Sequence, residues 1–72
     1  MRLLYINNSG GGFADYVEVT PGTTVAQFFQ ERQPDHKPDD FLIRVNRQVA
    51  AADQILVEGD RVSMTATKIE GA

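Results

Sequence analysis

The chain has no cysteine, a single histidine and no long hydrophobic run, and each scarcity excludes a class of protein. Without cysteine there is no disulfide to stabilise a small secreted domain and no thiol nucleophile. No apolar stretch approaches the roughly 18 residues that a membrane helix needs, so we expect no membrane partner. The first residues lead directly into a strand-like segment rather than a signal peptide, which favours a cytoplasmic location.

Positive charge is also limited. Seven Lys and Arg residues stand against ten Asp and Glu residues, which gives a formal net charge of -3. The bases are spread along the chain with acids between them, so such a surface repels a phosphate backbone. The sequence therefore predicts that nucleic acid is not a partner.

The residues of a catalytic site are missing as well. There is no Ser-His-Asp set and no metal-ligand spacing, and 72 residues leave little room for an internal cavity. His36 lies near Asp35, Asp39 and Asp40, where a metal or acid-base role can be imagined, but adjacent loop carboxylates are more often simply solvated. We expect a protein that is not an enzyme and that has no metal, no cofactor and no catalytic residues.

The first half of the chain reads as a β-hairpin followed by a helix. Residues 2–7 and 13–19 have strand patterns, and the turn between them contains three consecutive glycines. These glycines lack the lysine of a phosphate loop and precede a strand, so a hairpin turn is the better interpretation. Thr24 and Gln27 fit a capping box, and Pro34 predicts that the helix ends near Gln33. Three apolar residues share one helical face: Val25, Phe28 and Phe29.

The second half is rich in strands. Residues 41–46 predict a strand whose Ile43 and Val45 face the helix, and a tight reversal then leads into a very short strand at residues 48–50. Residues 51–57 are a linking segment of weak apolar content, and residues 58–60 supply a turn. In the final strand, residues 61–67, an apolar face alternates with a polar one, and its apolar members are Val62, Met64 and Ala66.

This order of elements predicts a single domain over residues 1–72 of the α+β class. The arrangement that fits is a β-grasp, or ubiquitin-like, roll. It has a mixed sheet of four to five strands with one helix packed across it, and its first and last strands are parallel. Residues 68–72 are expected to form a flexible C-terminal tail.

Four segments carry a resemblance to a known family. They are Met1-Arg2-Leu3-Leu4-Tyr5, Gly22-Thr23-Thr24-Val25-Ala26-Gln27-Phe28, Val45-Asn46-Arg47-Gln48-Val49 and Glu58-Gly59-Asp60-Arg61-Val62. Together they resemble the ThiS/MoaD-type sulfur carrier branch of ubiquitin-like proteins along nearly the whole chain. The resemblance implies an E1-like adenylating enzyme as partner, which uses ATP to activate the terminal carboxylate of the carrier. It also implies a biosynthetic synthase or a target protein that receives sulfur or the acyl group.

The chain end is the site that this resemblance implies. Family members end in Gly-Gly, whereas this chain ends in Gly71-Ala72. Ala72 adds one methyl group but keeps the carboxylate, so activation and conjugation are expected at Gly71 and Ala72. The methyl group favours a divergent modifier or a non-reactive module over a sulfur carrier, because a narrow cleft shaped for Gly-Gly is easily overpacked. A short tail of small residues is also what an ordinary frayed terminus looks like.

A second class of function is a non-reactive β-grasp interaction module that docks on or regulates a partner enzyme. Alternation places several side chains on the sheet face that turns away from the helix, where they form a modest apolar patch with a polar rim. The expected partner-binding residues are Leu4, Leu42, Arg44 and Thr65, together with Lys68 and Ile69 of the tail. Scattered surface leucines are also normal in soluble proteins.

Overall fold

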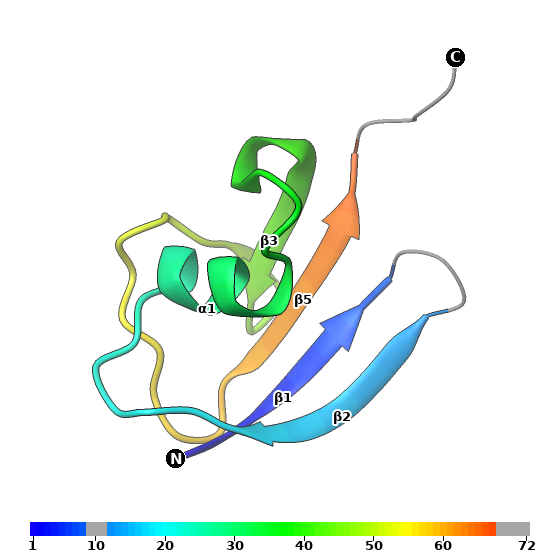
Figure 1. The fold of residues 1–72 in the computed structure, drawn as a ribbon. Coiled ribbons are helices and arrows are strands. Elements are labelled where there is room, and N and C mark those ends of the chain that lie inside the picture. Colours follow the sequence, from blue (N-terminus) through cyan, green and yellow to red (C-terminus); the bar gives the residue numbers. More distant parts are fainter. Residues whose placement is uncertain (9–11, 68–72) are drawn as a thin grey trace.

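The computed structural model describes residues 1–8 and 12–67, and these residues form a five-stranded mixed sheet with one α-helix across it (Figure 1). The elements in chain order are β1 (Arg2–Asn7), β2 (Phe13–Glu18), α1 (Val25–Arg32), the short 3₁₀ helix η1 (Pro38–Asp40), β3 (Phe41–Val45), β4 (Gln48–Val49) and β5 (Arg61–Ala66). The spatial order of the strands is β2-β1-β5-β3-β4. β1 and β5 are parallel neighbours at the centre, and the other neighbouring pairs are antiparallel. The predicted β-grasp architecture is confirmed.

Helix α1 begins and ends where local signals predict. The Thr24 hydroxyl accepts a hydrogen bond from the Gln27 N–H (3.2 Å), and the Gln27 side chain accepts one from the Thr24 N–H (3.0 Å). This reciprocal pair satisfies two amides that the first turn of a helix leaves without a partner. At the other end, the Gln33 N–H donates to the Phe29 carbonyl (2.7 Å), and Pro34 follows.

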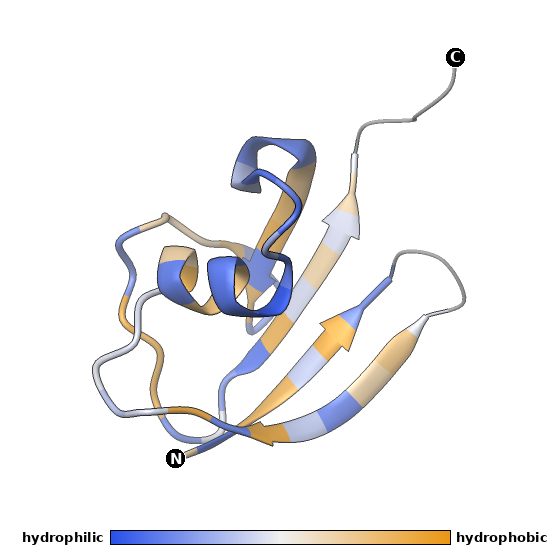
Figure 2. Ribbon diagram, viewed as in Figure 1, coloured by the Kyte–Doolittle hydropathy of each residue, from blue (hydrophilic) through white to orange (hydrophobic). Residues whose placement is uncertain are grey.

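The core lies between α1 and one face of the sheet, and Figure 2 shows apolar segments in the helix and along the strands. The aromatic rings of this core are packed edge to face. Tyr5 and Phe28 have ring centroids 5.5 Å apart, and Phe29 and Phe41 have centroids 5.1 Å apart. The buried apolar residues are Leu3, Tyr5, Val19, Val25, Phe28, Phe29, Ile43, Val45, Leu56, Val62 and Met64.

Three details differ from the sequence-based expectations. The short helix η1 directly before β3 was not expected, and its last turn is closed by a bond from the Phe41 N–H to the Pro38 carbonyl. The linking segment 51–57 contributes Leu56 to the core, where this side chain is 1% exposed. Ala66 was expected on the apolar face of the last strand, and it lies opposite Phe41, but at the end of β5 its side chain is exposed rather than buried.

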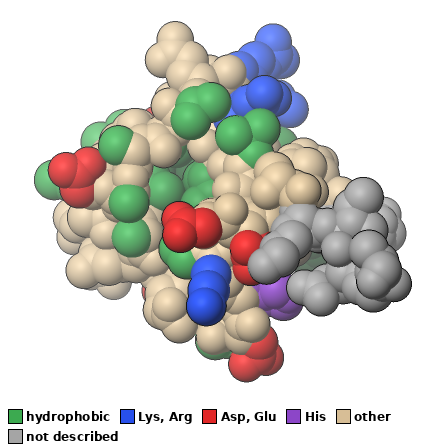
Figure 3. Space-filling model, turned by 90° about the horizontal axis from the view of Figure 1, so that it is seen from above, with side chains coloured by type: hydrophobic (Ala, Val, Ile, Leu, Met, Phe, Trp, Pro, Cys, Tyr) green, Lys and Arg blue, Asp and Glu red, His purple; other side chains and the backbone are tan. Residues whose placement is uncertain are grey.

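An open hollow lies at one edge of the sheet, between α1 and the start of β3, and we call it the edge hollow. Figure 3 looks down on it and shows hydrophobic side chains around a depression, with acidic side chains close by. Its volume is about 240 Å³. The apolar residues that line it include Val25, Phe41, Ile43, Val49, Ala50 and Ala52.

Candidate partner-binding face and chain end

The sheet has a second face, which turns away from α1 and which we call the open face. Alternate residues of each strand point to it, because Leu3, Tyr5, Val62 and Ile43 point into the core on the other side. No other element among the described residues covers this face. Its members are Leu4 and Ile6 of β1, Ala14, Tyr16 and Glu18 of β2, Leu42 and Arg44 of β3, and Arg61, Ser63 and Thr65 of β5.

The strand register shows where four of the predicted partner-binding residues lie on the open face: Leu4, Leu42, Arg44 and Thr65. Leu4 is opposite Arg61, whereas Leu42 is opposite Thr65. These two positions on β5 are four residues apart, which corresponds to about 13 Å along the strand. Leu4 and Leu42 therefore belong to two separate ends of the face, with polar side chains of β5 between them. Arg44 lies opposite Ser63, near the middle.

Two further residues join the open face that were not named as site residues. Ile6 is half-buried and lies opposite Ser63, so it extends the apolar surface from Leu4 toward the middle of the sheet. Tyr16 is 61% exposed, and the Arg2 guanidinium lies 5.0 Å from the centre of its ring. The alternation within β2 was the signal that could have placed Tyr16 here.

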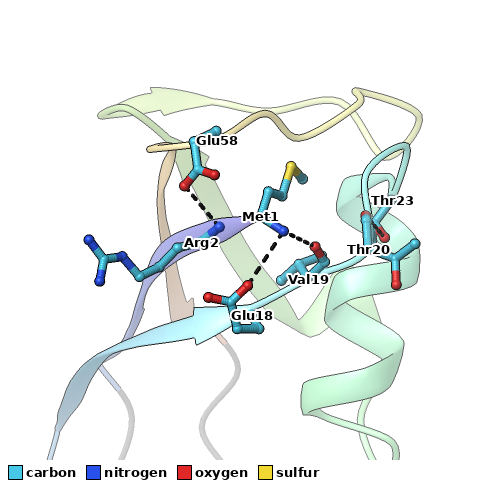
Figure 4. A network of polar contacts seen from close by, with 7 residues as sticks. All are labelled: Met1, Arg2, Glu18, Val19, Thr20, Thr23 and Glu58. Carbon is cyan, nitrogen blue, oxygen red and sulfur yellow. Dashed lines mark hydrogen bonds and ion pairs between the residues drawn. The ribbon is translucent and has the colours of Figure 1, made fainter.

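The end of the open face near Leu4 is held by a polar network (Figure 4). The amino group of Met1 donates to the Val19 carbonyl (2.8 Å) and lies 3.5 Å from the Glu18 carboxylate. The Arg2 N–H donates to the Glu58 carboxylate (2.9 Å), which ties β1 to the turn that precedes β5. These contacts fix the three segments relative to one another.

The opposite end of the open face is held at Thr65 and Thr67. The Asn8 side-chain amide donates to the Thr65 hydroxyl (3.0 Å), and the Asn8 N–H donates to the Met64 carbonyl (2.9 Å). Both the N–H and the hydroxyl of Thr67 donate to the Asp40 carbonyl, at 2.9 and 3.1 Å. The remaining predicted site residues lie outside the described part of the chain: Lys68, Ile69, Gly71 and Ala72.

His36, a possible metal or acid-base residue in the sequence, lies beside an aromatic ring. The imidazole of His36 packs edge-on against the ring of Phe41, with centroids 5.5 Å apart. Within residues 1–8 and 12–67, no three His, Cys, Asp or Glu side chains are grouped as metal ligands. The same residues contain no helix whose length and hydropathy suit a membrane span.

Comparison with known proteins gives matches by structure only. No protein-family model matches the chain, and no curated protein sequence matches it. A solved ubiquitin-like protein from the hyperthermophilic archaeon Caldiarchaeum subterraneum matches with a TM-score of 0.71 and 17% identity, over 96% of this chain and 99% of the other. Caldiarchaeum subterraneum ubiquitin matches with a TM-score of 0.73 and 18% identity, over 99% and 98%.

A third solved structure, SAMP1 from Haloferax volcanii, has a TM-score of 0.72 and 14% identity, and the match covers 100% of both chains. The sequence identities are low, but these matches span almost the full length of each protein. Together with the parallel pairing of β1 and β5, they establish the fold. The protein has the ubiquitin-like β-grasp fold.

Proposed function

We propose that this chain is a small ubiquitin-like carrier or modifier whose C-terminal carboxylate is activated by an E1-like adenylating enzyme. The observation that carries the proposal is the position of β5. This last strand is hydrogen-bonded to β1 on one side and to β3 on the other, and Thr67 is fixed to Asp40 directly after it. Ala72 is the fifth residue after Thr67 in the sequence.

Chain geometry limits how far the reactive group is from the folded body. Five extended residues span at most about 17 Å, so the Ala72 carboxylate stays within that distance of the end of β5. An enzyme that acts on this carboxylate must therefore contact the body of the domain as well. The nearest part of the open face is the end that carries Thr65 and Leu42, which supports a role for these two residues in partner binding.

The proposed chemistry needs no catalytic side chain in this protein. The Ala72 carboxylate attacks the α-phosphate of ATP in the partner's active site, which forms an acyl-adenylate and releases pyrophosphate. Hydrosulfide then displaces AMP to give a thiocarboxylate, or an amine of a target protein displaces AMP to give an amide. The small side chains of Gly71 and Ala72 suit entry into a narrow cleft.

A second candidate function is a non-reactive docking module. The open face favours it, because Leu4, Ile6 and Leu42 are half-buried and Tyr16 is exposed on a surface that no described element covers. Aromatic and aliphatic side chains within a polar rim are typical of protein interfaces. In this case the partner binds the face, and the tail takes no part.

One experiment separates the two functions. The purified chain is incubated with ATP, hydroxylamine and each E1-like protein encoded in the same genome, and its intact mass is measured. Activation predicts a hydroxamate at Ala72, because hydroxylamine traps an acyl-adenylate. The matched control is the chain without Gly71 and Ala72, which should fold normally but give no adduct.

Two outcomes would contradict the activation proposal. An equal amount of hydroxamate on the shortened chain would show that a carboxyl group other than that of Ala72 is activated. Binding to the E1-like proteins with no ATP-dependent adduct would favour the docking module.

A further inference from the structure

Strand β4 covers only half of its neighbour β3. β4 has two residues, which pair with Arg44 and Val45, and the ladder ends with a bond from the Ala50 N–H to the Ile43 carbonyl (3.1 Å). Among the described residues, the return bond from the Ile43 N–H to the carbonyl of residue 50 is not formed. After Ala50 the chain leaves the sheet, and the Ala52 carbonyl accepts a hydrogen bond from the Ala26 N–H of the helix (2.9 Å).

The free part of β3 presents a defined pair of backbone groups. The bond from the Thr67 N–H to the Asp40 carbonyl sets the phase of the β3–β5 ladder, so the N–H and C=O of Phe41 and Ile43 point away from β5. The Phe41 N–H is already bonded to the Pro38 carbonyl. This leaves the Phe41 carbonyl and the Ile43 N–H at the edge.

These two groups fit a parallel strand. In a parallel ladder, a residue of the added strand lies opposite one residue of its neighbour. Its N–H donates to the carbonyl of the residue before that one, and its carbonyl accepts from the N–H of the residue after that one. An antiparallel neighbour would need the Ile43 carbonyl, which Ala50 already occupies. An added residue opposite Leu42 would therefore use both free groups, and the side chains before and after it would point toward the helix side.

The helix side of this edge is where the edge hollow lies. Its wall is formed by apolar side chains of α1, β3 and β4, and its volume of about 240 Å³ is large enough for aliphatic side chains. The free backbone pair and the apolar hollow are thus adjacent, because Phe41 and Ile43 contribute to both. A β-strand that docks at such an edge gains main-chain hydrogen bonds and side-chain burial together.

The acidic side chains at the rim of the edge hollow indicate which charge the added segment carries. Asp39 lines the edge hollow, and Asp53 follows Ala52 of its wall. Both are exposed, and the one ion pair formed within residues 1–8 and 12–67 joins Met1 and Glu18, so neither of these acids is paired with a cation there. A basic side chain complements this rim, whereas a second copy of this acidic chain would bring further like charge.

We propose that the edge hollow binds an extended segment of a partner protein, which lies parallel to residues 41–43. Two aliphatic side chains of that segment enter the hollow, and a Lys or Arg on its N-terminal side faces Asp39. The lining of the edge hollow shares only Leu42 with the open face, and the proposal uses none of the residues that follow Thr67. The proposal therefore holds whether or not Ala72 is activated.

The test is an NMR titration of the ¹⁵N-labelled chain with the peptide acetyl-Lys-Val-Thr-Val-Thr-amide. Saturable shifts are expected at the amides of residues 39–43 and 49–52, with a downfield proton shift of the Ile43 amide as it gains an acceptor. Replacing the peptide Lys by Glu should weaken binding about threefold, as expected for an exposed ion pair. Methylating the nitrogen of the central Thr, which removes the donor to Phe41, should weaken it about fivefold.

A charge-reversal pair of variants gives the matched control. Asp39→Lys should reverse the preference, so that the Glu peptide binds more tightly than the Lys peptide. Asp35→Lys makes the same charge change on an exposed residue outside the hollow and should leave the preference as it is. Shifts confined to β2, self-association without peptide, or no saturable change at millimolar peptide would each overturn the proposal.

Discussion

The Asp60 carboxylate accepts a hydrogen bond from the side-chain amide of Asn46 at 3.0 Å, which joins the β3–β4 turn to the start of β5. The second oxygen of Asp60 accepts from the Val57 N–H (2.9 Å), and the backbone carbonyl of Asp60 accepts from the Leu4 N–H (3.0 Å). Asn46 in turn accepts from the Arg61 N–H (3.0 Å). Asp60 is the buried charged residue of the described chain, at 6% exposed, and these bonds explain how it is tolerated there.

Replacing Asp60 by Ala should lower the free energy of unfolding by about 2 kcal/mol, because the Asn46 amide and the Val57 N–H lose their acceptor. Urea denaturation measures the change. The control is Asp53→Ala, which removes an exposed carboxylate and should cost less than about 0.5 kcal/mol. Equal losses for the two variants would mean that net charge, not this network, sets the stability.

Leu56→Ala should destabilise the domain by about 3 kcal/mol, since it empties a fully buried site against the helix. The neighbouring Ile55 is 59% exposed, so Ile55→Ala is the matched control and should cost about 1 kcal/mol or less. Thermal or urea unfolding of both variants checks the difference. A similar cost at the two positions would show that Leu56 does not anchor the linking segment.

Arg47→Gly should stabilise the protein by about 1 kcal/mol. Asn46 and Arg47 have φ angles of 53° and 72°, so the two-residue turn between β3 and β4 requires left-handed backbone at both positions. Arginine is strained there and glycine is not. The control Arg47→Ala removes the side chain but keeps the strain, so any gain in stability from Arg47→Ala would assign the effect to the guanidinium.

The activation proposal gives a kinetic prediction for the open face. Leu42→Ala should raise the KM of the E1-like enzyme for this chain about fivefold, because Leu42 lies near the end of β5 where the tail emerges. The turnover rate in saturating chain should be unchanged, since the carboxylate is untouched. Val57→Ala alters an exposed apolar residue elsewhere and serves as the control. A fall in turnover without a change in KM would argue against a docking role for Leu42.

Local signals predicted most of the secondary structure correctly. The capping box at Thr24 and Gln27 depends on residues three apart, and the first strand was assigned its observed bounds, residues 2–7, from its own pattern and the turn after it. The reversal at Asn46 and Arg47 was likewise marked by a short polar pair between two apolar runs. Such features form from neighbours in sequence, so the sequence alone reveals them.

Apart from the parallel pairing of the first and last strands, several features that depend on distant residues were not predicted. Leu56 lies in a segment without a clear periodic apolar pattern, and its place in the core depends on residues far away in the sequence; its N–H donates to the Thr23 carbonyl (2.9 Å). The role of Asp60 depends on Asn46, 14 residues away. On the open face, alternation placed Leu4 and Leu42 on the same side, but only the strand order shows that β5 separates them.

The parallel pairing of β1 with β5 has a mechanical consequence. The chain enters the sheet at the start of one central strand and leaves it at the end of the other, so Met1 and Thr67 lie at opposite ends of the pair. Tension applied between Met1 and Thr67 would load the hydrogen bonds between these strands in shear, and these bonds would have to break together. The separation of β1 from β5 would therefore be the step of mechanical unfolding that needs the greatest force.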